Sequence, residues 1–250
     1  ISRTGTLFTT QKGEKSIEAK DAEIVAKSLR PLPAEWFGLK DIEERYRKRY
    51  LDLILNPEVK EKIITRSKII ETLRRDLAKQ GFIEVETPTL QPIPGGALAK
   101  PFITHHNALN CDFYLRVAPE LYLKRLLVAG FEKVYEIGRD FRNEGIDNDH
   151  NPEFTMFELY WAYHNWEDLM KFTKKLLKKF IVGNEAKWGK ITYSKAIKQY
   201  AGKDIKKLKP EEMDEVFKKE VRPKLIEPIF VTEYPKSISP FAKPLQNKPK

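Results

Sequence analysis

The chain has 250 residues, of which 41% are hydrophobic and 33% charged, and its formal net charge is +10. This length and composition are typical of a soluble globular protein with one or two domains. No apolar run approaches the roughly 18 residues that a membrane helix needs, so we expect no membrane partner. We also expect no secretory signal, because Ile1–Gly13 is polar.

The surplus of positive charge leaves two interpretations open. It favours a polyanionic partner, and it is equally typical of a lysine-rich solvated surface. The one cysteine, Cys111, cannot form an intrachain disulfide, which fits a reducing compartment and predicts a cytoplasmic location. We expect Cys111 to be a buried small side chain rather than a nucleophile. No Cys/His spacing resembles a zinc site.

The first half of the chain predicts a hairpin, a helical linker and a long helix. Gly5–Thr10 and Glu14–Ala19 flank a turn at Lys12-Gly13. The basic and aromatic stretch Arg45–Tyr50 is expected to be helical. A long helix should begin at Asn56-Pro57 and end at Gly81. Its apolar face would contain Val59, Ile63, Ile70, Leu73 and Leu77, and a strand should follow over Phe82–Thr87.

A further helix should open at Ala118-Pro119-Glu120 and end before Gly130. Glu120 would then lie in the first turn, where the helix dipole favours a carboxylate. Gly95 and Gly96 permit either a tight turn or close approach of the backbone to a ligand.

The most informative segment is Val134–Tyr163, which predicts two strands joined by a polar loop. Because side chains alternate across a strand, Arg142 and Glu144 should share a face of the first strand, with Gly138 beneath them. On the second strand one face should contain Phe154, Met156, Glu158 and Tyr160, and the loop contains His150 and Asn151. These residue types suit a ligand with a phosphate, a flat ring and a cationic end.

After Trp161 the chain is expected to be mostly helical. Residues 183–225 are rich in lysine and should form a peripheral helical insertion. A short buried strand is expected over Ile229–Tyr234.

These motifs together resemble the class II aminoacyl-tRNA synthetases in their lysine-specific form. FRNEG followed by HNPEFTMFELYWAY resembles motif 2, and GFIEVETPTLQPIPGGA at Gly81–Ala97 resembles motif 1, with its proline at Pro88. LRPLP and RYRKRYLDLI resemble the link between anticodon-binding and catalytic domains. The ordered series covers most of residues 1–182 and resumes at Ile226–Lys243.

The resemblance implies an α+β fold, with an antiparallel sheet flanked by helices in residues 57–250. Residues 1–30 would be the last part of an OB-fold anticodon-binding barrel, and residues 31–56 a linker used for interdomain packing, dimer packing or tRNA contact. Pro88 is implied at a homodimer interface. Motif 3 is rich in glycine and is not expected here, because the last glycine is Gly202. The family's metal ligands lie in that same region, so none is expected in this chain.

The function that the resemblance implies is lysine–tRNA ligase, with ATP, Mg²⁺, L-lysine and tRNA(Lys) as substrates and partners. A paralogue that lysylates proteins and a non-catalytic tRNA-binding fragment remain alternatives.

The resemblance also assigns roles to residues. Arg142 would bridge the α-phosphate and the lysine carboxylate, although the strand pattern alone equally allows a salt bridge with Glu144 or Glu158. ATP would further contact Glu144, His150, Asn151 and Phe154. Lysine would be held by Gly96, Glu120, Arg142, Glu158 and Tyr160.

Overall fold

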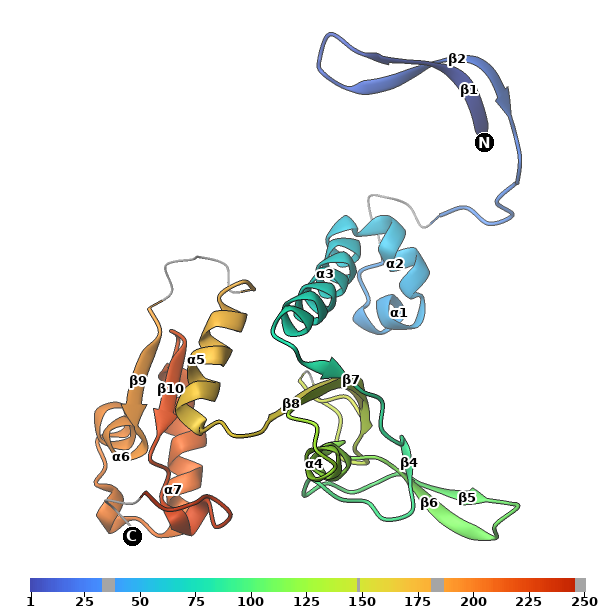
Figure 1. Ribbon diagram of the computed structural model, residues 1–250. Helices are drawn as coiled ribbons and strands as arrows, with labels where there is room; N and C mark the ends of the chain where they lie inside the picture. Colours follow the sequence, from blue (N-terminus) through green and yellow to red (C-terminus); the bar gives the residue numbers. More distant parts are fainter. Residues whose placement is uncertain (33–38, 148, 181–186, 246–250) are drawn as a thin grey trace. The chain divides into compact units, whose positions relative to one another are not determined.

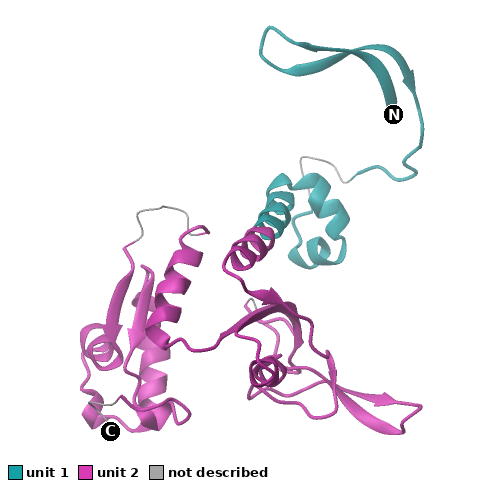
Figure 2. Ribbon diagram, viewed as in Figure 1, with its two compact units in different colours: residues 1–68 teal, residues 69–250 magenta. Residues whose placement is uncertain are grey.

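The computed structural model describes residues 1–32, 39–147, 149–180 and 187–245. Figure 1 shows the order of the elements along the chain. The chain divides into two compact units, residues 1–68 and 69–250, which are coloured separately in Figure 2.

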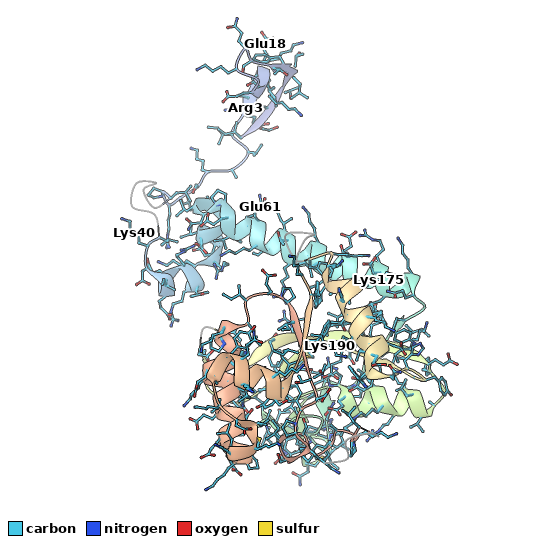
Figure 3. The ribbon with its side chains drawn as sticks, turned by 90° about the vertical axis from the view of Figure 1, so that its left-hand side faces the viewer. Arg3, Glu18, Lys40, Glu61, Lys175 and Lys190 are labelled. Atoms are coloured by element: carbon cyan, nitrogen blue, oxygen red, sulfur yellow. The ribbon has the colours of Figure 1, made fainter. Side chains whose placement is uncertain are left out.

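The first unit begins with the predicted hairpin, which is confirmed with longer strands. β1 (Ser2–Thr9) pairs antiparallel with β2 (Lys15–Glu23), and Gly13 takes a positive φ of 83° in the turn. The side chains of Arg3 and Glu18 project from this hairpin (Figure 3), and every residue of β1 is exposed. The assignment of the hairpin to a barrel stays a prediction.

The predicted helical structure at Arg45–Tyr50 is confirmed, as two short helices rather than one, while the assignment of residues 31–56 to a linker stays a prediction. These are α1 (Ile42–Arg47) and α2 (Arg49–Leu55), and α3 (Pro57–Lys79) begins just after them. Asp52 is fully buried, forms an ion pair with Arg45 at 2.7 Å, and accepts a hydrogen bond from the Asn56 amide at 2.7 Å. A buried carboxylate satisfied in this way fixes α2 against α1. The LRPLP motif reaches residue 33, which lies outside the described residues.

The second unit is organised around a three-stranded sheet in the order β3-β7-β8. β7 (Lys133–Phe141) pairs antiparallel with β8 (Glu153–Trp161), and β3 (Ile83–Glu84) pairs parallel with β7. β3 is shorter than the predicted strand over Phe82–Thr87.

One face of the β7–β8 hairpin packs on the core. The buried centre of that core comprises Leu77 at the end of α3, Phe82, Tyr135, and Phe172 and Leu176 of α5 (Trp166–Leu177). Partly buried side chains from the same face of the hairpin surround it: Ile137, Phe157, Leu159 and Trp161. Because side chains alternate, the opposite face of the hairpin is the one available for chemistry.

A second sheet has the order β4-β6-β5 and is antiparallel throughout. Its strands are β4 (Leu90–Gln91), β5 (Ile103–His106) and β6 (Cys111–Leu115), and α4 (Glu120–Val128) follows. α4 contacts both β7 and β8. Cys111 is exposed, so the expectation of a buried cysteine is wrong. Its position opposite His106 at the tip of a projecting hairpin explains the exposure.

The last part of the chain differs from the expected helical insertion. β9 (Gly189–Thr192) pairs parallel with β10 (Ile229–Thr232), and residues 183–186 of the insertion lie outside the described residues. Short helices lie between the two strands: α6 (Tyr193–Ala196), Ile197–Ala201, Ile205–Lys207, α7 (Pro210–Val216), Phe217–Val221 and Arg222–Lys224; Lys236–Ile238 follows β10. The helices bury a second core of Tyr193, Ala196, Ile197, Val216 and Val221.

The fold class α+β with antiparallel sheets is confirmed, with two parallel pairings, β3–β7 and β9–β10, that were not predicted. Among the described helices, none is both long and apolar enough to cross a membrane.

We predict that Leu77→Ala lowers the free energy of unfolding by about 2–5 kcal/mol, because Leu77 is fully buried under the β7–β8 hairpin. Urea denaturation followed by circular dichroism measures the change. Val128→Ala is the matched control, because Val128 is 90% exposed and should cost less than about 0.5 kcal/mol. Equal losses for both variants would contradict this placement of the core.

Candidate active site

The polar face of the β7–β8 hairpin is defined by strand register. Glu136 lies opposite Glu158, Gly138 opposite Met156, and Asp140 opposite Phe154. Tyr160 follows on the same face of β8, opposite Val134. The predicted shared face of Phe154, Met156, Glu158 and Tyr160 agrees with this register. Carboxylates therefore gather on a sheet surface whose other side is the hydrophobic core.

One end of this face is acidic. The Tyr160 hydroxyl donates to Glu158 Oε2 at 3.3 Å. Burial raises the pKa of Glu158, and the negative charges of Asp140, Glu120 and Glu136 raise it further, against the hydrogen bond from Tyr160. Burial and the charges of Glu158 and Glu120 also raise the pKa of Tyr160, which keeps the phenol protonated. A cationic group entering here would relieve this repulsion.

Glu120 reaches the same region from α4, where it is the first helical residue, as predicted. It forms an i,i+4 ion pair with Lys124. Gly96 has a positive φ of 92°, and a Cβ there would lie 3.1 Å from the Cβ of Glu120. The structure thus brings Gly96 beside Glu120, and Glu120 within electrostatic range of Glu158 and Tyr160.

Arg142 lies at the other end of the face. β7 ends at Phe141, so the prediction that Arg142 and Glu144 lie within the first strand is wrong. The Arg142 N–H still donates to the Pro152 carbonyl at 2.8 Å, so pairing continues for one residue and Arg142 follows the alternation of Asp140. The regular β7–β8 pairing ends at Phe141, because the polar loop begins directly after it.

The Arg142 guanidinium is partly buried and has an unused donor. Its Cζ lies 5.1 Å from the centre of the Phe154 ring. Its Nε is buried and has no hydrogen-bond partner among the described residues. A buried guanidinium donor without a partner is costly, and an anionic ligand would satisfy it.

Other predicted ATP contacts lie in the loop between β7 and β8 and are exposed. Glu144 and Asn151 are exposed, and His150 Nδ1 lies 2.8 Å from both carboxylate oxygens of Asp147. The Asn143 N–H donates to the Lys100 carbonyl at 2.7 Å and anchors the start of the loop. The structure does not gather these three side chains into one contact, so their roles stay predictions.

Pro88 lies in the segment between β3 and β4, and its carbonyl accepts a hydrogen bond from the Gln91 amide at 3.1 Å. Its role at a dimer interface stays a prediction.

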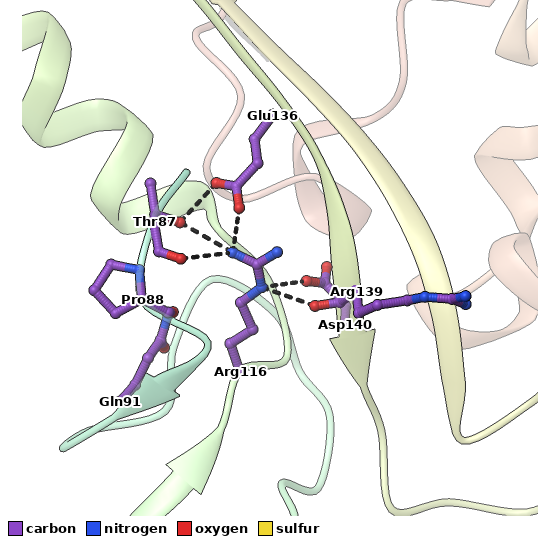
Figure 4. Close-up of polar contacts among 7 residues, drawn as sticks. All are labelled: Thr87, Pro88, Gln91, Arg116, Glu136, Arg139 and Asp140. Carbon is purple, nitrogen blue, oxygen red and sulfur yellow. Dashed lines mark hydrogen bonds and ion pairs between the residues drawn. The ribbon is translucent and has the colours of Figure 1, made fainter. Parts of the chain in front are cut away.

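Sequence reasoning missed the most connected side chain of the face, Arg116 (Figure 4). It is 2% exposed and forms ion pairs with Glu136 and with Asp140, the latter at 3.0 Å. Its Nε donates to the Arg139 carbonyl at 2.8 Å, and its Nη1 donates to the carbonyl and hydroxyl oxygens of Thr87 at 3.2 and 3.1 Å. The Thr87 hydroxyl donates in turn to Glu136 Oε2 at 2.6 Å.

Gly138 makes room for this network. A Cβ at position 138 would lie 2.0 Å from Arg116 Nη2, so any side chain would displace the guanidinium. The signal in the sequence was the alternation Glu136, Gly138, Asp140, which places two acids and a gap on one face of the strand.

Asp140 is fully buried, and neither of its oxygens has a hydrogen bond among the described residues. Arg116 Nε is close enough for an ion pair but directs its N–H to the Arg139 carbonyl. Burial raises the pKa of Asp140 to about 6, against the opposing charge of Arg116. The folded state therefore holds this proton at pH values where the unfolded chain has lost it.

This predicts that the wild type loses stability relative to Asp140→Asn as pH rises. In the folded state the pKa of Asp140 is about 6, above the ordinary value of 3.8. The stability that the protonated Asp140 side chain contributes is therefore fully present below pH 3.8 and is lost as pH rises past 6. We expect the difference in unfolding free energy to change by about 2 kcal/mol between pH 4 and pH 7. Thermal denaturation across this range measures it. A flat profile for Asp140→Asn across this range would contradict the prediction.

No group of three or more histidine, cysteine or acidic side chains that could hold a metal ion is found among the described residues.

The comparison with protein families is decisive. Residues 41–250 match the family model of tRNA synthetases class II (D, K and N). The chain belongs to the class II tRNA synthetases. Within them it is similar to curated proteins that are each named lysine–tRNA ligase.

The relative from Pelotomaculum thermopropionicum is 50% identical over 97% of this chain and 56% of that protein. The relative from Carboxydothermus hydrogenoformans is 48% identical over 100% of this chain and 59% of that protein. The relative from Moorella thermoacetica is 47% identical over 98% and 58%, respectively. The chain thus spans a little over half the length of the curated relatives it matches.

Proposed function

We propose that this synthetase chain acts in lysine–tRNA ligation: activation of L-lysine with ATP, followed by transfer to tRNA(Lys). The observation that carries the proposal is the acidic end of the β7–β8 face, where Glu120, Glu158 and Tyr160 converge beside Gly96. The printed names of its relatives point to the same substrate.

The chemistry needs positioning rather than a protein nucleophile. A lysine carboxylate oxygen forms a bond to the α-phosphorus of ATP, the bond from that phosphorus to the bridging oxygen breaks, and pyrophosphate leaves. The lysyl group then passes to a ribose hydroxyl of tRNA(Lys) and AMP leaves. Arg142 suits the first step, because its planar fork can hold the carboxylate and the phosphate, two anions that repel each other.

The rest of the ATP site would form around Arg142. Phe154 offers a ring for the adenine, and Glu144 an acceptor for its amino group. His150 and Asn151 would close over the nucleotide from the loop that Asn143 anchors. Mg²⁺ would accompany ATP.

Selectivity for lysine would follow from the sign of the charge. The family model spans enzymes for D, K and N, that is aspartate, lysine and asparagine. Two carboxylates and a phenol attract the two ammonium groups of lysine and repel an aspartate side chain. A site built from buried polar groups of this kind can discriminate by about 10⁴ or more.

We further propose that the protein works as a cytoplasmic homodimer, with Pro88 near the dimer interface. A protein-lysylating paralogue has less support, because such paralogues lack the domain that would precede the linker, and here a β-hairpin does precede it.

We predict that Glu158→Gln weakens L-lysine binding about 10- to 100-fold and leaves ATP binding within about twofold, because one charge-assisted hydrogen bond to an ammonium group is lost. Isothermal titration calorimetry with each ligand measures both. Glu153→Gln is the matched control, since Glu153 lies on the opposite face of the same strand and is 55% exposed. Equal losses for lysine and ATP would contradict the assignment of the amine pocket.

We predict that Arg142→Ala lowers lysine-dependent ATP–pyrophosphate exchange by about 10²- to 10³-fold, because the group that joins the two anions is lost. Arg139→Ala, which removes an exposed guanidinium from the opposite face of β7, should retain exchange. Circular dichroism confirms that both variants fold. Normal exchange in Arg142→Ala would remove Arg142 from this role.

A further inference from the structure

Two carboxylates face each other directly across the β7–β8 hairpin. Glu136 and Glu158 are partners in the register, so their Cβ atoms are about 5 Å apart on one face. Like charges directly opposite each other destabilise a sheet. The two nevertheless have different surroundings: Glu136 is 4% exposed, whereas Glu158 is only partly buried.

The difference arises from Arg116. It pairs with one carboxylate oxygen of Glu136, and the Thr87 hydroxyl donates to the other at 2.6 Å. Both oxygens of Glu136 are therefore committed, and Figure 4 shows its carboxylate facing Thr87 and Arg116. Among the described residues Glu158 has one hydrogen bond, the long one from Tyr160, so its second oxygen is available to a ligand.

We propose that Arg116 is a positioning residue for the amine pocket: by pairing with Glu136, it keeps Glu158 ionised and available to the cationic end of the substrate. The inference rests on the proposed function, because it takes L-lysine as that substrate. Arg116 itself is turned to Glu136, Asp140 and the backbone of β7, and acts on the substrate only through Glu158.

The charges around Glu158 support this role. From β7, Glu136 and Asp140 raise the pKa of Glu158, and from α4 Glu120 does the same, while Tyr160 on its own strand lowers it. Three cationic residues offset these acids: Arg116 pairs with Glu136 and Asp140, Lys124 pairs with Glu120, and Arg142 opposes Asp140. Of these, only Arg116 contacts Glu136. Its loss would leave Glu136 without a cationic partner beside Glu158.

Gly138 supports the inference independently. A Cβ at position 138 would lie 2.0 Å from Arg116 Nη2. Because glycine has no Cβ, the surface of the sheet leaves room there for the Arg116 guanidinium.

The test is a titration of the Glu158 carboxyl carbon by ¹³C NMR in the ligand-free chain, with the resonance assigned from Glu158→Gln. We expect Arg116→Gln to raise the pKa of Glu158 by about one unit and Glu136→Gln to lower it by a similar amount. The double variant Arg116→Gln/Glu136→Gln should return it close to the wild-type value. A merely structural disturbance would move both single variants in the same direction and would not be rescued.

L-lysine binding, measured by calorimetry from pH 5.5 to 8.5, should follow these shifts. Glu158 must be ionised to bind an ammonium group, so Arg116→Gln should weaken binding by up to about tenfold at the acid end of this range and much less at pH 8.5. Arg139→Gln is the control, since its side chain lies on the opposite face of β7, paired with Glu153.

Each outcome decides the matter. The role of Arg116 would be overturned if the pKa of Glu158 stayed the same in the single variants or moved in the same direction in both. If Arg116→Gln fails to fold, Glu136→Gln is compared with the double variant: a higher pKa of Glu158 in the double variant supports the inference, and an equal one overturns it. Wild-type chain that binds no L-lysine at any pH would instead overturn the proposed substrate, while the titration still decides what Arg116 does to Glu158.

Discussion

The ion pair between buried Arg116 and Glu136 is the interaction on which the candidate site depends. Taking these charges out of water is costly unless both are satisfied. Thr87 and the Arg139 carbonyl provide the remaining hydrogen bonds, so the segment after β3, the residue that follows β6 and the strand β7 are joined at one point. The contacts of Arg116 fix the polar face of the β7–β8 hairpin, and the hydrophobic core around Leu77 fixes the apolar face.

The two ends of that face differ in charge because of how the acids are partnered. Glu136 is fully committed to Arg116 and Thr87, Asp140 is buried with a pKa raised to about 6, and Glu120 is paired with Lys124, which leaves Glu158 to meet a cation. Arg142, at the end of the strand, has a buried donor without a partner. The proposed substrate, an amino acid with two ammonium groups and a carboxylate that must meet a phosphate, would match this polarity.

The site is therefore a property of strand alternation combined with a few long-range contacts. The hairpin alone would place Glu136 opposite Glu158, and the two carboxylates would repel each other. The remote residues Thr87 and Arg116, which lie 49 and 20 positions from Glu136 in the sequence, make that pairing tolerable. Gly138 is the local adaptation that lets the remote guanidinium approach the sheet.

The sequence by itself determined the hairpin, the long helix, the helix that begins at Glu120 and the shared face of Glu158 and Tyr160. These follow from local periodicity, capping and alternation, which neighbouring residues specify. Only the tertiary structure decided where β7 ends, that Cys111 is exposed, that β9 pairs with β10, and that Arg116 lies between Glu136 and Asp140. The pairing of β9 with β10 and the position of Arg116 depend on contacts between residues far apart in the chain, and no local pattern encodes which distant partner satisfies a buried charge or a strand edge.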